Sequence, residues 1–153
     1  MISIDEAINK YTDMVYRLAL SRTKKVCDAE DILQDVFYSL IKNFNKINDE
    51  EHLKAWLIKV TINKTISFFN SSNKKKNIAL SEDLAYLPKE KSDVYYAVMN
   101  LKKDYRTVIH LFYYEDLSVL EISAILKQKE STIRSKLHRA RNLLKEKLEG
   151  SSL

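Results

Sequence analysis

The stretch Leu117-Ser-Val-Leu-Glu-Ile-Ser-Ala-Ile-Leu-Lys-Gln-Lys-Glu-Ser-Thr-Ile-Arg-Ser-Lys-Leu-His-Arg-Ala-Arg141 decides the fold of the C-terminal part of the chain. Ser118 and Glu121 have the spacing of a capping box, which predicts that a helix begins directly after Ser118. After a break at residues 127–129, Ser131 can cap a second helix. The inner face of that helix would consist of Ile133, Leu137, Ala140 and Leu144. Two such helices around so short a break predict a helix-turn-helix.

The second of these helices is strongly basic. Residues 131–147 carry six Lys or Arg side chains and one Glu, a local net charge of +5. Arg can bond guanine through two hydrogen bonds, Ser and Thr suit base edges or phosphates, and Lys suits phosphates. The alternative is an ordinary helical hairpin with a solvated basic face. The residues that we expect to contact DNA are Ser131, Thr132, Arg134, Ser135, Lys136, His138, Arg139 and Arg141.

The turn between the two helices holds Lys127 at the position that Gly most often takes in such motifs. A residue other than Gly with a positive φ angle costs about 1 kcal/mol. The turn is therefore expected to be mildly strained or to have a different shape.

The composition predicts helices throughout. The 153 residues are 45% hydrophobic, yet they include only one Gly and one Pro, too few to build hairpin turns between strands. A single cysteine, Cys27, excludes an internal disulfide and suits a reducing compartment. No run of about 20 apolar residues could span a membrane, and residues 1–6 are acidic where a signal peptide is basic. We expect a soluble, cytoplasmic, all-α protein.

Apolar residues recur at helical spacing in three segments of the N-terminal half. The clearest repeat is Ala29, Ile32, Leu33, Val36, Phe37, Leu40, Ile41 and Phe44, which predicts one buried helix face. Residues 77–93 hold scattered apolar residues, acids and the only proline, which is typical of a linker. The predicted organisation is two small helical domains, 1–76 and 94–149, joined by a flexible linker at 77–93.

No enzyme is indicated. The three histidines fall in three separate segments, and none has a Cys or His neighbour at metal-ligand spacing. A glycine-rich phosphate loop cannot form with one glycine. We expect no catalytic residue, no metal and no cofactor.

Four stretches carry a resemblance to a known family. Leu101-Lys-Lys-Asp-Tyr-Arg-Thr-Val-Ile-His-Leu-Phe-Tyr-Tyr-Glu-Asp-Leu-Ser118, followed by Ser135-Lys-Leu-His-Arg-Ala-Arg141, resembles the C-terminal domain of extracytoplasmic-function (ECF) sigma factors of the sigma-70 family. Asp28-Ala-Glu-Asp-Ile-Leu-Gln-Asp-Val-Phe37 and Leu53-Lys-Ala-Trp-Leu-Ile-Lys-Val-Thr-Ile-Asn63 resemble their N-terminal domain. The resemblance implies a promoter-specificity subunit that recruits core RNA polymerase and starts transcription at a dedicated set of promoters.

The resemblance also implies roles for single residues of the N-terminal domain. One set would grip the clamp helices of the polymerase β′ subunit: Asp31, Gln34, Asp35 and Tyr38. A second set would open the −10 promoter element and capture an unstacked base: Asn45, Lys46, Asn48, Lys59, Asn63 and Lys64. Trp56 lies on the apolar stripe and is expected in the core. Ser67 and Asn70 stand where the family often has Asp and Arg, so contacts made by those residues are not carried over.

In the C-terminal domain, Arg134, Ser135, His138 and Arg139 match positions that contact bases of the −35 element in the family. Lys136 and Arg141 would then neutralise flanking phosphates. The partners implied are core RNA polymerase (β′ clamp helices and β flap), promoter DNA and an anti-sigma factor. The alternative function is a conventional helix-turn-helix regulator that dimerises through its N-terminal helices. A further class is an interaction protein whose basic helix binds acidic protein or RNA.

Overall fold

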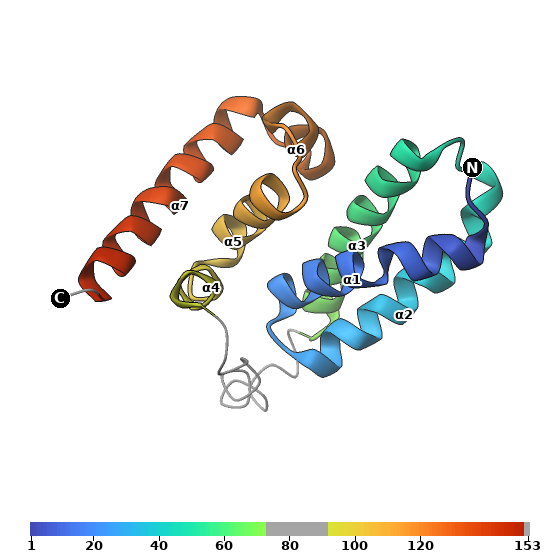
Figure 1. The fold of residues 1–153 in the computed structure, drawn as a ribbon, viewed down its shortest axis with the longest axis horizontal. Helices are drawn as coiled ribbons and strands as arrows, with labels where there is room; N and C mark the ends of the chain where they lie inside the picture. Colours follow the sequence, from blue (N-terminus) through green and yellow to red (C-terminus); the bar gives the residue numbers. More distant parts are fainter. Residues whose placement is uncertain (73–91, 152–153) are drawn as a thin grey trace. The chain divides into compact units, whose positions relative to one another are not determined.

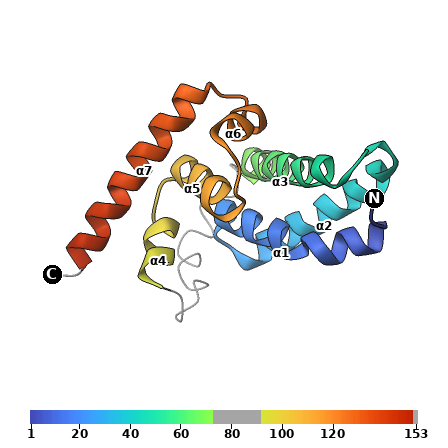
Figure 2. The ribbon, with the colours of Figure 1, turned by 45° about the horizontal axis from the view of Figure 1, so that its top comes forward.

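A computed structural model describes residues 1–72 and 92–151, and helices account for nearly all of them (Figures 1 and 2). No strand occurs among these residues. The chain divides into two compact units, residues 1–87 and 88–153. The predicted all-α architecture with two helical domains is therefore confirmed. Most of the predicted linker at 77–93 lies outside the described residues, whose second part begins at Ser92.

Within residues 1–72, the N-terminal unit has three α-helices: α1 (Ile4–Thr23), α2 (Val26–Asn43) and α3 (Glu50–Ser72). Each of the three contacts both of the others, and α1 and α2 run antiparallel side by side (Figures 1 and 2). A short 3-10 turn, η1 (Phe44–Lys46), follows α2. The core that the three helices share includes Val15, Val36, Leu40, Leu53 and Leu57, all fully buried. Burial of apolar side chains of this size contributes about 1.5–3 kcal/mol each, which holds the three helices together.

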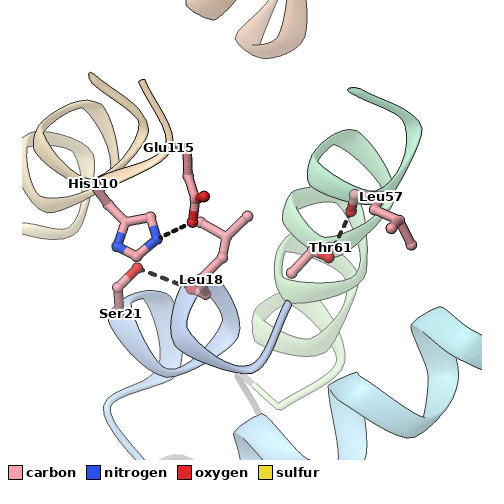
Figure 3. A network of polar contacts seen from close by, with 6 residues as sticks. All are labelled: Leu18, Ser21, Leu57, Thr61, His110 and Glu115. Atoms are coloured by element: carbon pink, nitrogen blue, oxygen red, sulfur yellow. Dashed lines mark hydrogen bonds and ion pairs between the residues drawn. The ribbon is translucent and has the colours of Figure 1, made fainter. Parts of the chain in front are cut away.

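Polar side chains inside this unit bond back to the backbone or to one another. The hydroxyls of Ser21 and Thr61 donate to the carbonyls of Leu18 and Leu57, at 2.9 and 2.6 Å (Figure 3). Arg22 of α1 donates through Nε to the hydroxyl of Thr65 on α3, at 2.9 Å. Because buried polar groups are costly unless they are hydrogen-bonded, these contacts offset the cost of burying these side chains between the helices.

The C-terminal unit comprises α4 (Asp93–Met99), α5 (Lys103–Ile109), the π-helical turn η4 (His110–Tyr114), α6 (Val119–Leu126) and α7 (Glu130–Ser151). The long helix α7 contacts α4, α5 and α6. Val108 of α5, Ile122 of α6 and Ile133 of α7 are buried. The predicted capping box is confirmed: the Ser118 hydroxyl accepts from the Glu121 N–H, and the Glu121 carboxylate accepts from the Ser118 N–H.

The π-helical turn directly precedes the helix-turn-helix. Its closing hydrogen bond runs from the N–H of Glu115 to the carbonyl of His110, at 3.2 Å. The Nε2 of His110 also lies 3.0 Å from a carboxylate oxygen of Glu115 (Figure 3). The ring of Tyr114 stacks on the His110 ring with centroids 5.2 Å apart. Backbone and side chains thus close the same five-residue turn.

Two sequence expectations need correction. Ile41 was expected on the buried stripe of α2, but its side chain is 60% exposed, because the last turn of the helix carries it past the core. Ser131 was expected to cap the final helix, but α7 begins at Glu130, so Ser131 lies inside its first turn. The structure also gives Lys127 a left-handed conformation, φ 56° and ψ 45°, as the turn position predicted.

Candidate nucleic-acid interface

The basic helix α7 separates its two faces cleanly. Ile133, Leu137 and Ala140 are buried against the other helices of the unit. The intervening side chains are exposed, and this set comprises Ser131, Thr132, Arg134, Ser135, His138, Arg139 and Arg141. We call these seven residues the basic face. One stripe therefore anchors the helix while hydroxyl, imidazole and guanidinium groups remain available on the outside, as reading a DNA groove requires.

Several side chains of the basic face already have partners. Arg134 lies 3.7 Å from Glu130 in an exposed i,i+4 ion pair, and His138 lies 3.3 Å from the side-chain amide of Asn142. Exposed ion pairs contribute about 0–1 kcal/mol, so DNA can displace the first at little cost. Arg139 has no hydrogen-bond or ion-pair partner within residues 1–72 and 92–151.

Arg141 is held by the π-helical turn. Its Nε donates to the hydroxyl of Tyr113 at 2.6 Å, and its guanidinium lies 5.4 and 5.5 Å from the ring centroids of Phe112 and Tyr113. Cation–π contacts of this kind are worth about 0.5–1 kcal/mol at exposed sites. They restrict the rotamers of Arg141, so this cation is presented at a defined place on the helix.

Lys136 differs from the other predicted DNA contacts. Its side chain is only 21% exposed, and its ammonium donates to the side-chain carbonyl of Gln128 at 2.9 Å. The same ammonium lies 3.9 Å from a carboxylate oxygen of Asp104 on α5. The structure thus places Lys136 at the junction of α7, the turn and α5.

On the N-terminal unit, α2 exposes a mixed acidic and apolar face. The four predicted polymerase-binding residues are all exposed: Asp31, Gln34, Asp35 and Tyr38. Tyr38 is 62% exposed, and the Lys42 ammonium lies 4.4 Å from the centroid of its ring. Ile41 lies beside Tyr38 on the same helix and adds an exposed apolar side chain that the sequence analysis assigned to the core. We call these four residues together with Ile41 the α2 face.

The segment between α2 and α3 exposes polar side chains around one buried anchor. Asn45, Lys46 and Asn48 are exposed, whereas Ile47 between them is only 6% exposed and belongs to the core of the unit. Asp49 then accepts from the His52 N–H at 2.7 Å and so caps α3. Because Ile47 points inward, its neighbours are turned outward.

The first turn of α3 is also tied to α1. The Lys10 ammonium lies 2.6 Å from a carboxylate oxygen of Glu50. This hydrogen bond raises the pKa of Lys10 above its ordinary value. The contact joins the beginning of α3, directly after the turn that holds Asn48, to α1.

Along α3, Lys59, Asn63 and Ser67 follow one another at i,i+4 spacing and are exposed, and Lys64 is half-buried beside them. Trp56, expected in the core, is partly buried and packs against it. Phe68 packs against the same core, and its ring lies 5.6 Å from the ring of Phe69. Lys59, Asn63 and Ser67 therefore form one exposed row along α3.

The described residues contain neither a candidate metal cluster nor a candidate membrane span. Across residues 1–72 and 92–151, no three His, Cys, Asp or Glu side chains gather in a group that could hold a metal ion. Within the same ranges, no helix combines the length and the apolar character needed to cross a membrane.

Comparison with known families gives one match for each unit. Residues 7–75 match the family described as Sigma-70 region 2, and residues 91–144 match the family described as Sigma-70, region 4. The two matches cover the helices of both units in turn. The −10 and polymerase candidates fall inside the first match, and every residue of the basic face falls inside the second.

Individual relatives are sigma factors as well, in agreement with the family matches. The RNA polymerase sigma factor SigV of Bacillus subtilis is 31% identical over 136 residues, which is 85% of this chain and 81% of SigV. The ECF RNA polymerase sigma factor SigM of the same organism is 31% identical over 156 residues, 94% of each chain.

Solved structures give the same fold. The sigma factor RpoE from Bartonella quintana, solved with the anti-sigma factor NepR, aligns with a TM-score of 0.73 at 24% identity, covering 95% of this chain and 96% of that one. CnrH, solved with the cytosolic domain of CnrY, aligns with a TM-score of 0.68 at 18% identity, covering 96% and 88%.

Proposed function

Because the chain belongs to the ECF sigma factors of the sigma-70 family and is a promoter-specificity subunit of RNA polymerase, we propose that its two units divide the contacts with polymerase and promoter. The N-terminal domain, residues 1–76, binds core polymerase and opens the −10 element. The C-terminal domain, residues 94–149, holds the −35 element as duplex, and residues 77–93 link the two. The observation that carries this division is the presence in one chain of the exposed α2 face and the exposed basic face of α7.

The α2 face is proposed to bind the clamp helices of the polymerase β′ subunit. Carboxylates of Asp31 and Asp35 can pair with Arg side chains of a partner helix, where charge-assisted hydrogen bonds are about twice as strong as neutral ones. Tyr38 and Ile41 supply an aromatic and an aliphatic side chain, both of which are exposed to solvent in the free protein. Aromatic side chains surrounded by polar groups are frequent centres of protein–protein interfaces. We therefore add Ile41 to the four residues expected from the sequence.

The segment after α2 is proposed to hold the opened −10 element. Asn45, Lys46 and Asn48 present amides and a cation on a turn anchored by Ile47, which suits capture of an extruded base. Lys59, Asn63 and Lys64 on α3 would follow the backbone of the same single strand. Ser67 extends this row without the carboxylate that the family often has there, so we assign it no contact.

The basic face is proposed to enter the major groove at the −35 element. Arg134, Ser135, His138 and Arg139 would contact base edges, and Arg141 a flanking phosphate. Ser131 and Thr132, in the first turn of α7, would bond the backbone. Each promoter element alone is bound weakly. Because both domains are attached to one polymerase, binding of one domain raises the effective concentration of the other at its element.

An anti-sigma factor is the third proposed partner. The resemblance implies one, and the sigma factor RpoE from Bartonella quintana, whose fold is similar, was solved in complex with the anti-sigma factor NepR. It would mask the surfaces that bind polymerase. We also propose that the chain acts in the cytoplasm, where polymerase and promoter DNA are found.

Promoter binding with and without core polymerase tests this proposal. Genomic fragments transcribed by the reconstituted holoenzyme serve as labelled duplexes in gel-shift titrations. We expect specific shifts only when core polymerase is present. The double variant Asp35→Arg/Tyr38→Ala should lose core binding, whereas the matched charge change Asp13→Arg on the exposed side of α1 should not. Tight binding to an inverted repeat by the chain alone would instead support the conventional regulator.

A further inference from the structure

Lys136 sits in the basic helix, yet its ammonium is directed at protein. Its side chain is 21% exposed, compared with 64% for Arg134 half a turn earlier. The Nζ donates to Gln128 Oε1 at 2.9 Å and lies 3.9 Å from Asp104 Oδ2. One cation therefore connects the recognition helix α7, the turn before it and α5.

The partner Gln128 lies in the turn between α6 and α7. It follows Lys127, whose left-handed conformation costs about 1 kcal/mol in a residue with a Cβ. The backbone N–H of Gln128 donates to the carbonyl of Ser123 at 3.1 Å, which ties the turn to α6. Its side chain is held by Lys136, which ties the same residue to α7. Contacts on both sides of Gln128 thus oppose relaxation of an unfavourable turn.

Asp104 adds a second acceptor from another helix. Its side chain is 70% exposed, so its attraction for Lys136 is screened by water and is the weaker of the two contacts. The hydrogen bond to Gln128 is partly buried and is expected to dominate.

From these contacts we propose that Lys136 is a positioning residue for −35 recognition, which holds α7 at its angle to α6 through Gln128, and that it does not bind a DNA phosphate. This inference rests on the proposed −35 role of the basic face. Arg134, Ser135, His138 and Arg139 read bases only while α7 enters the groove at one angle. Loosening the turn would misplace all four at once, even though none of them is changed.

The salt dependence of −35 binding separates a positioning role from a phosphate contact. Each phosphate contact contributes about 0.9 to the slope of log K against log salt concentration. Lys136→Met removes the ammonium and retains the apolar stem, and Gln128→Leu removes only the acceptor and retains the charge of Lys136. Holoenzyme binding to a promoter duplex would be measured over a series of salt concentrations, and the same duplex carrying a scrambled −35 element would be titrated in parallel.

We expect both variants to weaken −35 binding by about three- to tenfold, the loss of one partly buried hydrogen bond, with slopes equal to that of the unaltered chain. The double variant should be no weaker than Lys136→Met alone, because that change already removes the hydrogen bond to Gln128. Arg141→Met is the control and should lower the slope by about one.

Two results would overturn the inference. In the first, Lys136→Met lowers the salt-dependence slope by about one while Gln128→Leu binds normally. Lys136 would then be a phosphate contact. The other is unchanged binding in both variants. Failure of the proposed function itself looks different, since the unaltered holoenzyme would then show no preference for the intact −35 element. If Lys136→Met fails to fold, Gln128→Leu alone decides, because it leaves every charge in place.

Discussion

The turn at residues 44–49 and the turn at residues 127–129 each precede a long helix that carries proposed DNA contacts, but different forces hold them. The first is anchored by Ile47, a buried member of the core of its unit. The second has no buried side chain and is held by polar contacts of Gln128 and by the left-handed Lys127. An apolar anchor ties the shape of a turn to the stability of the whole unit, whereas polar contacts allow the other turn to change locally.

The side chains proposed to contact DNA near the two turns also differ in their chemistry. Around and after the first, the six candidate contacts are three Asn and three Lys side chains, which suit a single unstacked strand. After the second, the basic face is rich in Arg, whose guanidinium suits guanine in a duplex. We therefore expect the first turn to be rigid enough to capture one base, whereas the second has only to hold a helix at an angle.

Removing the apolar anchor is expected to have the largest effect. Ile47→Ala should lower the free energy of unfolding of the N-terminal unit by about 2–5 kcal/mol, because it leaves a cavity in the core. The single tryptophan, Trp56, lies in this unit and reports its unfolding in urea by fluorescence. Ile41→Ala is the matched control: its side chain is 60% exposed, so the change should stay within about 0.5 kcal/mol. Equal effects of the two changes would contradict the anchor.

The second prediction separates the chemistry of the two turns. Arg139→Ala should weaken binding to the −35 element by about 1–3 kcal/mol and relax selectivity at one base pair. Asn45→Ala should leave −35 binding unchanged and reduce opening of the −10 element. Gel shifts of the holoenzyme measure the first property, and permanganate reactivity of unpaired thymines measures the second. If the double variant Arg134→Ala/Arg139→Ala kept normal promoter selectivity, the basic face would not take part in recognition of the −35 element.

The smallest expected effect is a gain in stability. Lys127→Gly removes the Cβ that the left-handed conformation penalises by about 1 kcal/mol. The greater freedom of Gly in the unfolded chain offsets part of that gain, which leaves about 0.5 kcal/mol.

Hydrogen exchange of the amides in α6 and α7 measures this local stability. Lys127→Ala retains the Cβ and should show no gain, which separates backbone relief from loss of the Lys side chain. If Lys127→Ala also raised the local stability of α6 and α7, the positive φ angle would not be the source of the strain.

Features that depend on neighbouring residues were predictable from the sequence. The capping box at Ser118 and Glu121 and the left-handed Lys127 follow from side chains within a few residues of each position. The exposure of Arg134 and Arg139 also follows from helical periodicity, because Ile133 and Leu137 fix which side of α7 is inward. The two-unit, all-helical fold followed from the same periodicity and the near absence of Gly and Pro.

Features that depend on distant packing were not predictable. Ile41 continues the apolar repeat of α2, but only the positions of α1 and α3 decide where that stripe leaves the core. Lys136 occupies an outward position by periodicity, yet its long side chain reaches Gln128 and Asp104, which sequence spacing does not reveal. The π-helical turn at His110–Tyr114 likewise has no signature in a run that reads as ordinary helix.

The left-handed Lys127 also limits how this turn can evolve. Lys codons reach Gly codons only by more than one base change, and the single-step intermediates encode Arg or Glu, which both retain a Cβ. Neither intermediate would relax the turn, so selection for a relaxed turn would not favour the first step towards Gly. Asn is one base change from Lys and enters the left-handed region more easily than most residues. The genetic code thus makes Lys127→Asn the accessible route by which mutation could relax this turn.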